Sequence, residues 1–203
     1  FTWYVPHDVK SLINLIGERQ FIDRLNAGFA TSEKVSFNAL GDNMGAYPIN
    51  HGNETNMQAA YLFSYTSEPW HTQKWARAIQ EKYYGMGPRD AYPGDEDQGQ
   101  MSSWYILSSI GLFQMDGGCS KDPVWLLGSP RFDRVEILLD NTYYSGKKLI
   151  IKAENVSKDN CYIQYVRFNN KRLSNNYIEW SKLKKGGTLH FIMGDRPNPN
   201  AFK

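Results

Sequence analysis

The stretch GDEDQGQMSSWYILSSIG, residues 94–111, marks the point where the sequence changes from helical to strand-like spacing. Met101 and Trp104 are apolar residues on one side of a helical pattern, and Gly111 is typical of the position just after a helix ends. The pattern predicts a helix over residues 98–110. The glycines and acids at its start predict an irregular loop directly before that helix.

Helical spacing fills most of the sequence before this stretch. Apolar residues repeat from Val9 to Ile16, and Gly17 can end that helix. Further helices are predicted from Glu18, around residues 59–65, and after Ser67, which we expect to cap a helix with Pro69 in its first turn. Between residues 31 and 52, glycines and a proline predict a long loop, and long loops in compact domains are often functional.

Short β-type runs follow residue 112. Turn residues such as asparagine and glycine separate them, and the intervals are too short for helical crossovers. The sequence therefore predicts an α+β fold, with a helical segment over residues 1–112 and a mostly antiparallel β-rich domain over residues 113–203. The predicted strands are 124–127, 135–139, 149–153, 162–168 and 189–193.

Composition narrows the class of protein. The chain has 203 residues and a net charge of +2, and its lysines and arginines are scattered along the sequence. This argues against a nucleic-acid partner, which usually requires a concentrated basic stripe. No run approaches the ~18 apolar residues of a membrane span. Aromatic residues make up 14% of the chain, which suits both a packed core and the stacking of sugar rings.

Two loops carry the side chains that best fit chemistry. They are His51-Gly52-Asn53-Glu54-Thr55 and Gly94-Asp95-Glu96-Asp97-Gln98-Gly99-Gln100, each directly before a predicted helix. The helix dipole favours negative charge at such a junction, and Asp95 and Asp97 point to the same side of an extended loop. The structural alternative is that Asp97 caps the helix that follows, and that Asn53 or Thr55 caps the helix upstream.

Other site chemistries lack their motifs in this sequence. The four histidines show no paired i, i+4 spacing, and neither Cys119 nor Cys161 lies in a Cys-x-x-Cys motif. Phosphate-binding and dinucleotide fingerprints are missing as well. What remains is a set of carboxylate and amide oxygens, which suits a hard cation such as calcium or acid and base work on sugars.

Several of these segments, taken together and in order, resemble glycoside hydrolase family 92. The resemblance extends over nearly the whole chain. Its motifs are Val5-Pro6-His7-Asp8, Gly52-Asn53-Glu54, Tyr61-Leu62-Phe63 through Pro69-Trp70, Gly99-Gln100-Met101-Ser102-Ser103-Trp104-Tyr105, Gly128-Ser129-Pro130-Arg131-Phe132-Asp133 and Gly194-Asp195-Arg196-Pro197-Asn198.

The resemblance implies an exo-acting, inverting, calcium-dependent α-mannosidase. Residues 1–112 would be the last part of an (α/α)6 catalytic barrel, and the family's general acid would lie a few residues before Phe1. Asp97 would be the general base, with Asp95 supporting or sharing that role. Glu54 and Asn53 would touch both the calcium ion and the mannose.

The segment before Gly52 departs from the family pattern. Asn50 and His51 occupy the positions where relatives that act on α-1,2 links carry His-Glu against the leaving sugar. We therefore expect Asn50 and His51 to bind substrate, with a linkage preference that this pattern does not define.

The resemblance also sets expectations for partners and place. The partners would be a mannose-containing glycan and upstream domains of the same parent chain, and the location would be secreted, periplasmic or on the outer surface of a bacterium. Without its general acid the isolated fragment should be inactive. The alternative is a non-catalytic carbohydrate-binding or structural module of a larger glycan-degrading protein.

Overall fold

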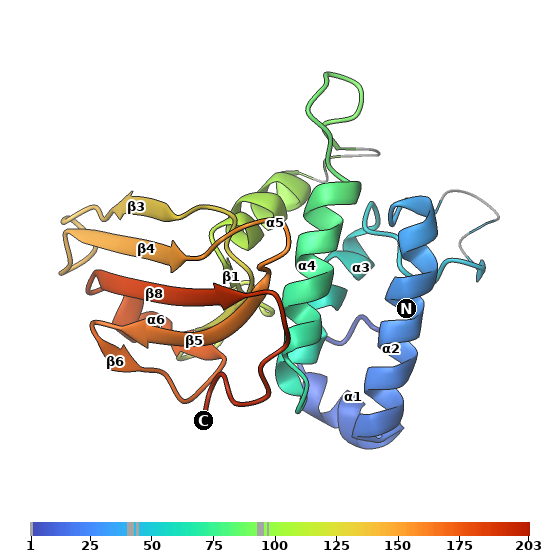
Figure 1. Ribbon diagram of the computed structural model, residues 1–203, viewed down its shortest axis with the longest axis horizontal. Coiled ribbons are helices and arrows are strands. Elements are labelled where there is room, and N and C mark those ends of the chain that lie inside the picture. Colours follow the sequence, from blue (N-terminus) through green and yellow to red (C-terminus); the bar gives the residue numbers. More distant parts are fainter. Residues whose placement is uncertain (1, 40–42, 44, 93–95, 97) are drawn as a thin grey trace. The chain divides into compact units, whose positions relative to one another are not determined.

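The chain combines helices with β-sheets, which confirms the expected α+β fold. The computed structural model describes residues 2–39, 43, 45–92, 96 and 98–203 (Figure 1). The chain divides into two compact units, Phe1–Ile106 and Leu107–Lys203, and each is described by itself.

The first unit is helical. Helix α1 is capped by Asp8, whose Oδ1 accepts a hydrogen bond from Ser11 N at 3.1 Å, and it ends at Gly17 with φ of 87°. No helix among the described residues is long and apolar enough to cross a bilayer. The elements are α1 Val9–Ile16, α2 Glu18–Ser32, η1 Glu33–Val35, α3 Glu54–Met57, η3 Gln58–Tyr65, α4 Trp70–Lys82 and α5 Gln100–Ser109, which continues into the second unit.

Aromatic rings form the centre of the helical unit. Phe29 of α2 stacks on Trp75 of α4 with ring centroids 5.3 Å apart, and Phe37 and Phe63 pack around this pair. All four side chains are buried. The indole N–H of Trp75 donates to Asn26 Oδ1 at 2.9 Å, so the one polar atom of this large ring is satisfied.

Two helix starts and one helix type differ from the sequence predictions. Ser67 does not cap α4, because the cap position is Pro69 and the N–H of Ser67 donates to Glu18 Oε1 at 2.6 Å. The predicted helix at residues 59–65 is a 3₁₀ helix, η3. Helix α5 begins at Gln100 instead of residue 98, because Gln98 and Gly99 adopt left-handed φ of 58° and 94°.

The second unit contains two sheets. A three-stranded sheet has the order β1-β2-β7, and a five-stranded sheet has the order β3-β4-β8-β5-β6 (Figure 1). Strand pairing is mostly antiparallel, as predicted, and the β4–β8 pair is parallel. The elements are β1 Leu112–Phe113, β2 Val124–Leu127, β3 Arg134–Leu138, β4 Lys148–Glu154, β5 Tyr162–Phe168, β6 Lys171–Arg172, β7 Tyr177–Glu179, α6 Trp180–Leu183 and β8 Gly187–Gly194.

One face of the five-stranded sheet is buried and the other carries polar side chains. In β8, Leu189, Phe191 and Met193 are buried, while Thr188 and His190 alternate with them on the opposite face. Strand β4 shows the same alternation, and in β5 a register shift between Ile163 and Tyr165 interrupts it. Period-two spacing thus fixes which residues join the core and which remain on the outer face.

The end of α5 depends on Gly111. Its φ of 82° is a left-handed conformation, and a Cβ at this position would meet Pro130 Cδ at 3.0 Å. Gly117 is also left-handed, with φ of 63°, but a Cβ there would meet nothing within 4 Å.

We expect Gly111→Ala to lower the free energy of unfolding more than Gly117→Ala does. Both substitutions strain the backbone by about 1 kcal/mol, and only Gly111→Ala adds the collision with Pro130. Urea unfolding of the two variants and the parent chain measures the difference. Equal losses would show that Pro130 does not restrict this position.

Candidate functional site

The segment from Asn50 to Glu54 is held in place by its own backbone and side chains. The N–H of His51 donates to Phe37 O at 2.8 Å, and Asn50 Oδ1 accepts from Gly52 N at 3.3 Å. Asn53 caps α3, since its Oδ1 accepts from Thr55 N at 3.2 Å and from Thr55 Oγ1 at 3.0 Å. The predicted capping role of Asn53 is confirmed, and both lone pairs of its side-chain oxygen are engaged.

Glu54 stands at the first position of α3, with its side chain exposed. Its carboxylate has no hydrogen-bond or ion-pair partner in the part of the chain that the structure describes. Its backbone oxygen accepts a hydrogen bond from Gln100 Nε2 at 3.4 Å. This contact joins the first of the two predicted site loops to the first residue of α5, directly after the second loop.

His51 is fully buried in an aromatic cage. Its ring centroid lies 4.3 Å from that of Trp104, 4.9 Å from Tyr83 and 5.5 Å from Tyr84. Tyr84 and Trp104 also stack nearly parallel, with centroids 5.9 Å apart. The cage therefore combines side chains from the end of α4 and from α5 around one residue of the loop.

A chain of hydrogen bonds fixes the protonation of His51. Its Nε2 lies 2.8 Å from Tyr84 Oη, and Tyr84 Oη donates to Met101 O at 3.2 Å. A phenol has one proton, and a carbonyl oxygen accepts only, so the Tyr84 oxygen must accept from Nε2–H of His51. The lone pair then lies on Nδ1, which is buried without a partner among the described residues. Burial lowers the pKa of His51 to about 3.

The structure describes the four residues predicted to bind substrate, which lie on one segment. It does not describe the predicted catalytic pair. Asp95 and Asp97 lie outside the described residues. Binding of substrate by Asn50 and His51 stays a prediction. In the structure the ring of His51 is enclosed, and its hydrogen bond goes to Tyr84.

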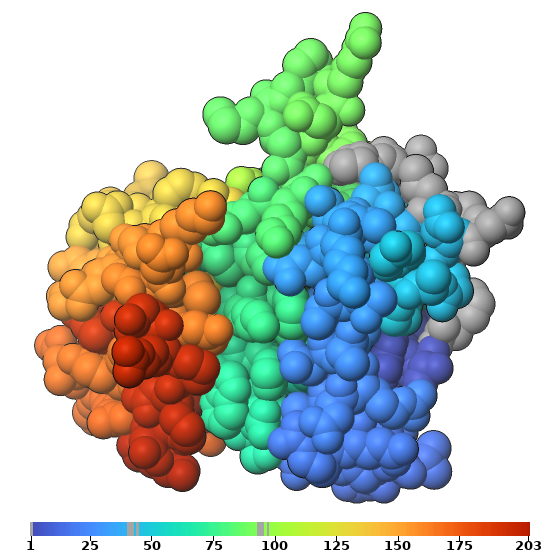
Figure 2. Space-filling model, turned by 45° about the vertical axis from the view of Figure 1, so that its right-hand side comes forward, coloured from blue at the N-terminus to red at the C-terminus, as the bar shows by residue number. Residues whose placement is uncertain are grey.

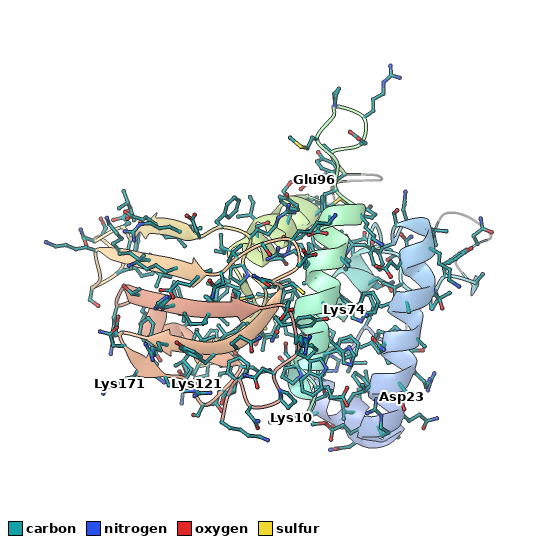
Figure 3. All side chains as sticks on the ribbon, viewed as in Figure 1. Lys10, Asp23, Lys74, Glu96, Lys121 and Lys171 are labelled. Atoms are coloured by element: carbon teal, nitrogen blue, oxygen red, sulfur yellow. The ribbon has the colours of Figure 1, made fainter. Side chains whose placement is uncertain are left out.

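Glu96, between those two aspartates in sequence, organises the start of α5 (Figure 3). Its carboxylate accepts from the N–H of Gly99 and, at 3.1 Å, from the N–H of Ser102. Hydrogen bonds from Ser102 and Gly99 lower the pKa of this carboxyl group. Glu96 is thus a helix-capping residue that sequence spacing missed, because the left-handed backbone at Gln98 and Gly99 turns the loop back towards it.

A projecting segment precedes the acidic loop. Residues 85–92 stand out from the helical unit beyond the end of α4 (Figures 1 and 2). Asp90 holds this segment together, since its backbone oxygen accepts from Gly85 N and its Oδ1 accepts from Gly87 N, both at 2.7 Å. Met86 in this segment is fully exposed.

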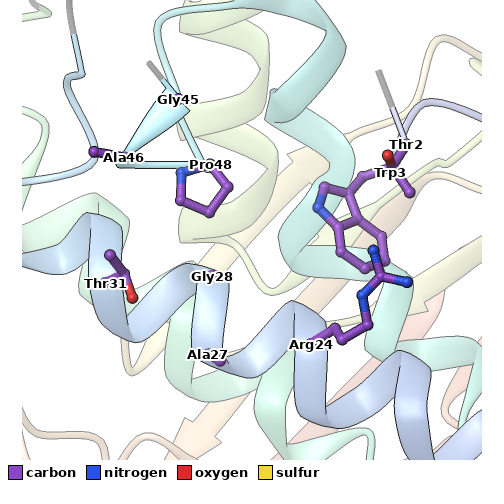
Figure 4. Close-up of a pocket in the computed structure, with 9 residues that line it drawn as sticks. All are labelled: Thr2, Trp3, Arg24, Ala27, Gly28, Thr31, Gly45, Ala46 and Pro48. Atoms are coloured by element: carbon purple, nitrogen blue, oxygen red, sulfur yellow. The ribbon is translucent and has the colours of Figure 1, made fainter. Parts of the chain in front are cut away.

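The helical unit also contains a cavity that sequence analysis missed. It has a volume of about 490 Å³ and lies beside the loop that leads to Asn50 (Figure 4). Trp3 and Arg24 form one side of it, with the guanidinium carbon 5.8 Å from the Trp3 ring centroid. Gly28, Gly45 and Pro48 are among the residues of the other side. The only sign of this cavity in the sequence was an aromatic residue together with small residues that lie far apart in sequence.

In the described part of the site, the oxygen atoms that could bind a metal ion are not clustered. No group of three or more His, Cys, Asp or Glu side chains gathers among the described residues. Glu54 contributes one carboxylate without a partner, and the two aspartates of the acidic loop are not described. This chemistry suits a hard cation or acid and base work completed by further carboxylates.

We expect the His51 ring to remain neutral between pH 5 and 8, with its proton on Nε2. Burial disfavours the imidazolium and Tyr84 accepts the Nε2–H. The measurement is the ¹⁵N chemical shift of both ring nitrogens across this range, with exposed His7 as an internal comparison. A His51 ring that titrates within this range would contradict the assignment.

The same burial links His51 to stability. Its folded pKa of about 3 lies below the ordinary value of 6.5, so between these values the unfolded chain binds the proton and the folded chain does not. Stability should therefore fall as the pH is lowered through this window, by up to about 1.4 kcal/mol per pH unit for this group.

Comparisons with known proteins agree on one family. Residues 1–195 match the model of the glycosyl hydrolase family 92 catalytic domain. An uncharacterized secreted glycosidase from Arthroderma benhamiae is 29% identical over 195 residues, which is 95% of this chain and 22% of the relative.

Solved structures give the same result. The family GH92 α-mannosidase BT3965 from Bacteroides thetaiotaomicron superposes with a TM-score of 0.81 at 32% identity, over 98% of this chain and 25% of that one. The same enzyme in complex with mannoimidazole gives 0.82 at 31% identity, over 98% and 25%. The inverting mannosidase BT2199 from the same organism gives 0.79 at 31% identity, over 99% and 28%.

This chain thus spans about a quarter of the length of its relatives. The matches agree over nearly all of its residues, in both the helical and the β-rich unit. The chain belongs to glycosyl hydrolase family 92.

Proposed function

We propose that this chain is the C-terminal part of an exo-acting, inverting, calcium-dependent α-mannosidase that removes terminal α-mannosides from glycans. Two of the similar solved structures are described as an α-mannosidase and as an inverting mannosidase. The α-mannosidase has also been solved with mannoimidazole bound.

The observation that carries the proposal is the junction of the two polar loops. Gln100 Nε2 binds the backbone oxygen of Glu54, and the His51–Tyr84–Met101 chain of hydrogen bonds joins the same loop to α5. A carboxylate at residue 54 is therefore held near the helix start that directly follows the acidic loop. An inverting glycosidase needs carboxyl groups arranged around one glycosidic bond with room for a water molecule.

We assign different roles to the three acidic residues of the second loop. Glu96 has both carboxylate oxygens engaged by backbone N–H groups, so it is committed to the helix start. We assign the general base to Asp97, which would take a proton from the attacking water, with Asp95 supporting it. The general acid belongs to a part of the parent protein outside this chain, so the chain alone should not turn over substrate.

Calcium fits Glu54 better than Asn53. Calcium takes 6–8 oxygen ligands, and the exposed Glu54 carboxylate has no partner in the described residues. Asn53 Oδ1 already accepts two hydrogen bonds from Thr55, which it would have to release to become a ligand. When bound, the ion would supply positive charge that attracts sugar hydroxyl oxygens. Glu54 would hold it and Asn53 would fix the position of Glu54.

The proposed substrate is a mannose-containing glycan met outside the cytoplasm. The Arthroderma relative is described as a secreted glycosidase, which supports an extracellular setting. We propose a secreted, periplasmic or cell-surface location for the parent protein. The alternative is a module that binds carbohydrate without turnover, and an activity test distinguishes the two.

We expect Asp97→Asn in the parent protein to lower kcat by roughly 10²–10⁴-fold, because a positioned general base contributes that much. The measurement is mannose release from α-linked mannobioses, with NMR of the first product to record inversion. Asp159→Asn, an exposed aspartate of the second unit, makes the same change of charge and should keep full activity.

Retained activity in Asp97→Asn would remove the base assignment. A parent protein that binds mannosides without releasing mannose would favour the alternative module instead.

We expect chelation of calcium by EDTA to abolish mannose release, and added calcium to restore it. Glu54→Gln should raise the calcium concentration needed for half-maximal activity, because one anionic ligand is lost. Glu81→Gln in α4 removes the same charge and should leave the calcium dependence unchanged. Activity that is indifferent to EDTA would refute the calcium proposal.

A further inference from the structure

A row of basic residues crosses the outer face of the five-stranded sheet. The strand register pairs Arg134 with Lys152, Lys152 with His190, His190 with Arg167, and Arg167 with Arg172. Paired residues of neighbouring strands point to the same side of a sheet, with Cβ atoms about 5 Å apart. The row therefore runs perpendicular to the strands. Its members are scattered between residues 134 and 190 in the sequence.

Four of the five members of the row have partners. Arg134 forms an ion pair with Glu136, and His190 Nε2 lies 2.9 Å from Glu154 Oε1. The guanidinium carbons of Arg167 and Arg172 lie 5.0 Å and 5.5 Å from the ring centroid of Tyr165.

Lys152 has no hydrogen-bond or ion-pair partner among the residues that the structure describes. Like charges placed directly opposite each other destabilise a sheet. Lys152 lies between Arg134 and His190 in the row, so an unpaired lysine there is a position where a bound anion would be stabilising.

Lys152 lines a polar cavity. The cavity has a volume of about 300 Å³ and is lined by Lys152, Asn169, Asn170, Thr188 and His190. These side chains offer an ammonium, an imidazole, two amides and a hydroxyl, all of which can donate hydrogen bonds. Every lining side chain carries a polar group.

The wall of the cavity is built by a tight turn. Asn169 and Asn170 connect β5 to β6 with left-handed φ of 48° and 68°, as a two-residue hairpin turn requires. Asn169 Oδ1 accepts from Thr188 N at 2.8 Å, which fixes this amide and leaves its NH₂ group to donate. A Cβ on Gly187 would lie 2.4 Å from Asn169 Oδ1, so glycine is what lets the turn close on β8.

We propose that this cavity binds a sugar that carries a phosphate or sulfate ester, with Lys152 holding the oxyanion and the asparagine amides and Thr188 holding sugar hydroxyls. A tetrahedral oxyanion accepts hydrogen bonds from several directions, which suits a lysine that is a flexible point charge. The flanking arginines add a positive field that raises the local concentration of anions.

The size and the lining of the cavity favour a sugar ester over a bare ion. The volume exceeds what one phosphate or sulfate requires, and amides and hydroxyls are the usual partners of sugar hydroxyls. The choice of a sugar as carrier rests on the proposed glycosidase function. The site itself is formed by residues of the second unit only, and it contains none of the proposed catalytic residues.

The test is binding to the intact chain, measured by calorimetry at low salt with glucose 6-phosphate and glucose 6-sulfate. Glucose, inorganic phosphate and inorganic sulfate are the comparison ligands. We expect at least one ester to bind about tenfold more tightly than glucose and than its own free anion. Affinity should fall as salt is raised, because ions screen an exposed charge pair.

Paired variants locate the site. Lys152→Gln should weaken binding about tenfold, as expected for loss of a charged hydrogen-bond donor. Glu154→Gln should strengthen binding, because it removes the carboxylate that competes at His190. Lys121→Gln is the matched control, since Lys121 lies in the segment before β2 of the other sheet and makes the same change of charge (Figure 3).

A further variant tests the site without disturbing the fold. Asn170→Gly keeps the left-handed backbone and removes only the amide that lines the cavity, so it should weaken the sugar ester several-fold with an unchanged unfolding curve.

Three results would overturn the proposal. They are equal affinity in Lys152→Gln and Lys121→Gln, equal affinity for the sugar ester and its free anion, and tighter binding of a single-stranded oligonucleotide through the same row. Because glucose esters are used and no turnover is measured, failure here is separate from failure of the mannosidase proposal. An inactive parent protein could still bind the ester, and an active one could fail to.

Discussion

The hydrogen bond between His51 Nε2 and Tyr84 Oη determines where the site loop lies. Residues 50–53 have no helix or sheet of their own to position them. The ring of His51 is buried among aromatic side chains, so loss of the bond would leave the Nε2–H of His51 unpaired in the interior. Tyr84 passes the constraint to Met101 of α5. Together with the hydrogen bond from Gln100 Nε2 to Glu54 O, this buried contact joins the segment to α5.

A second constraint is the hydrogen-bonding requirement at the start of α5, which Glu96 meets. Glu96 uses its carboxylate to satisfy backbone N–H groups that a helix start leaves without partners. A carboxylate held in this way has a lowered pKa and accepts hydrogen bonds from the backbone, so it is a poor proton carrier. The two aspartates beside it in sequence lie outside the described residues. The same short segment can thus contain a structural acid and, as proposed, catalytic ones.

Local patterns predicted much of the fold, and long-range contacts account for the rest. Helix α1 and strands β2 and β5 have the predicted bounds, because apolar periodicity and turn residues are readable within each segment. Strands β6 and β7 are two and three residues long and exist only through pairing with their neighbours. For the site, the sequence indicated the two loops, but not the cap at Glu96 or the enclosure of His51. Both depend on left-handed backbone or on rings from distant segments.

The parallel pairing of β4 with β8 has a consequence for the order of assembly. Strand β8 lies between β4 and β5 in the sheet, although it follows both of them along the chain. During synthesis on the ribosome, β3 and β4 can form a hairpin early, and so can β5 and β6, but the two hairpins have no common edge until residues 187–194 emerge. Until then each presents an unpaired edge to other nascent chains, which is a known route to aggregation. The five-stranded sheet therefore cannot be completed before its last strand in sequence has been synthesised.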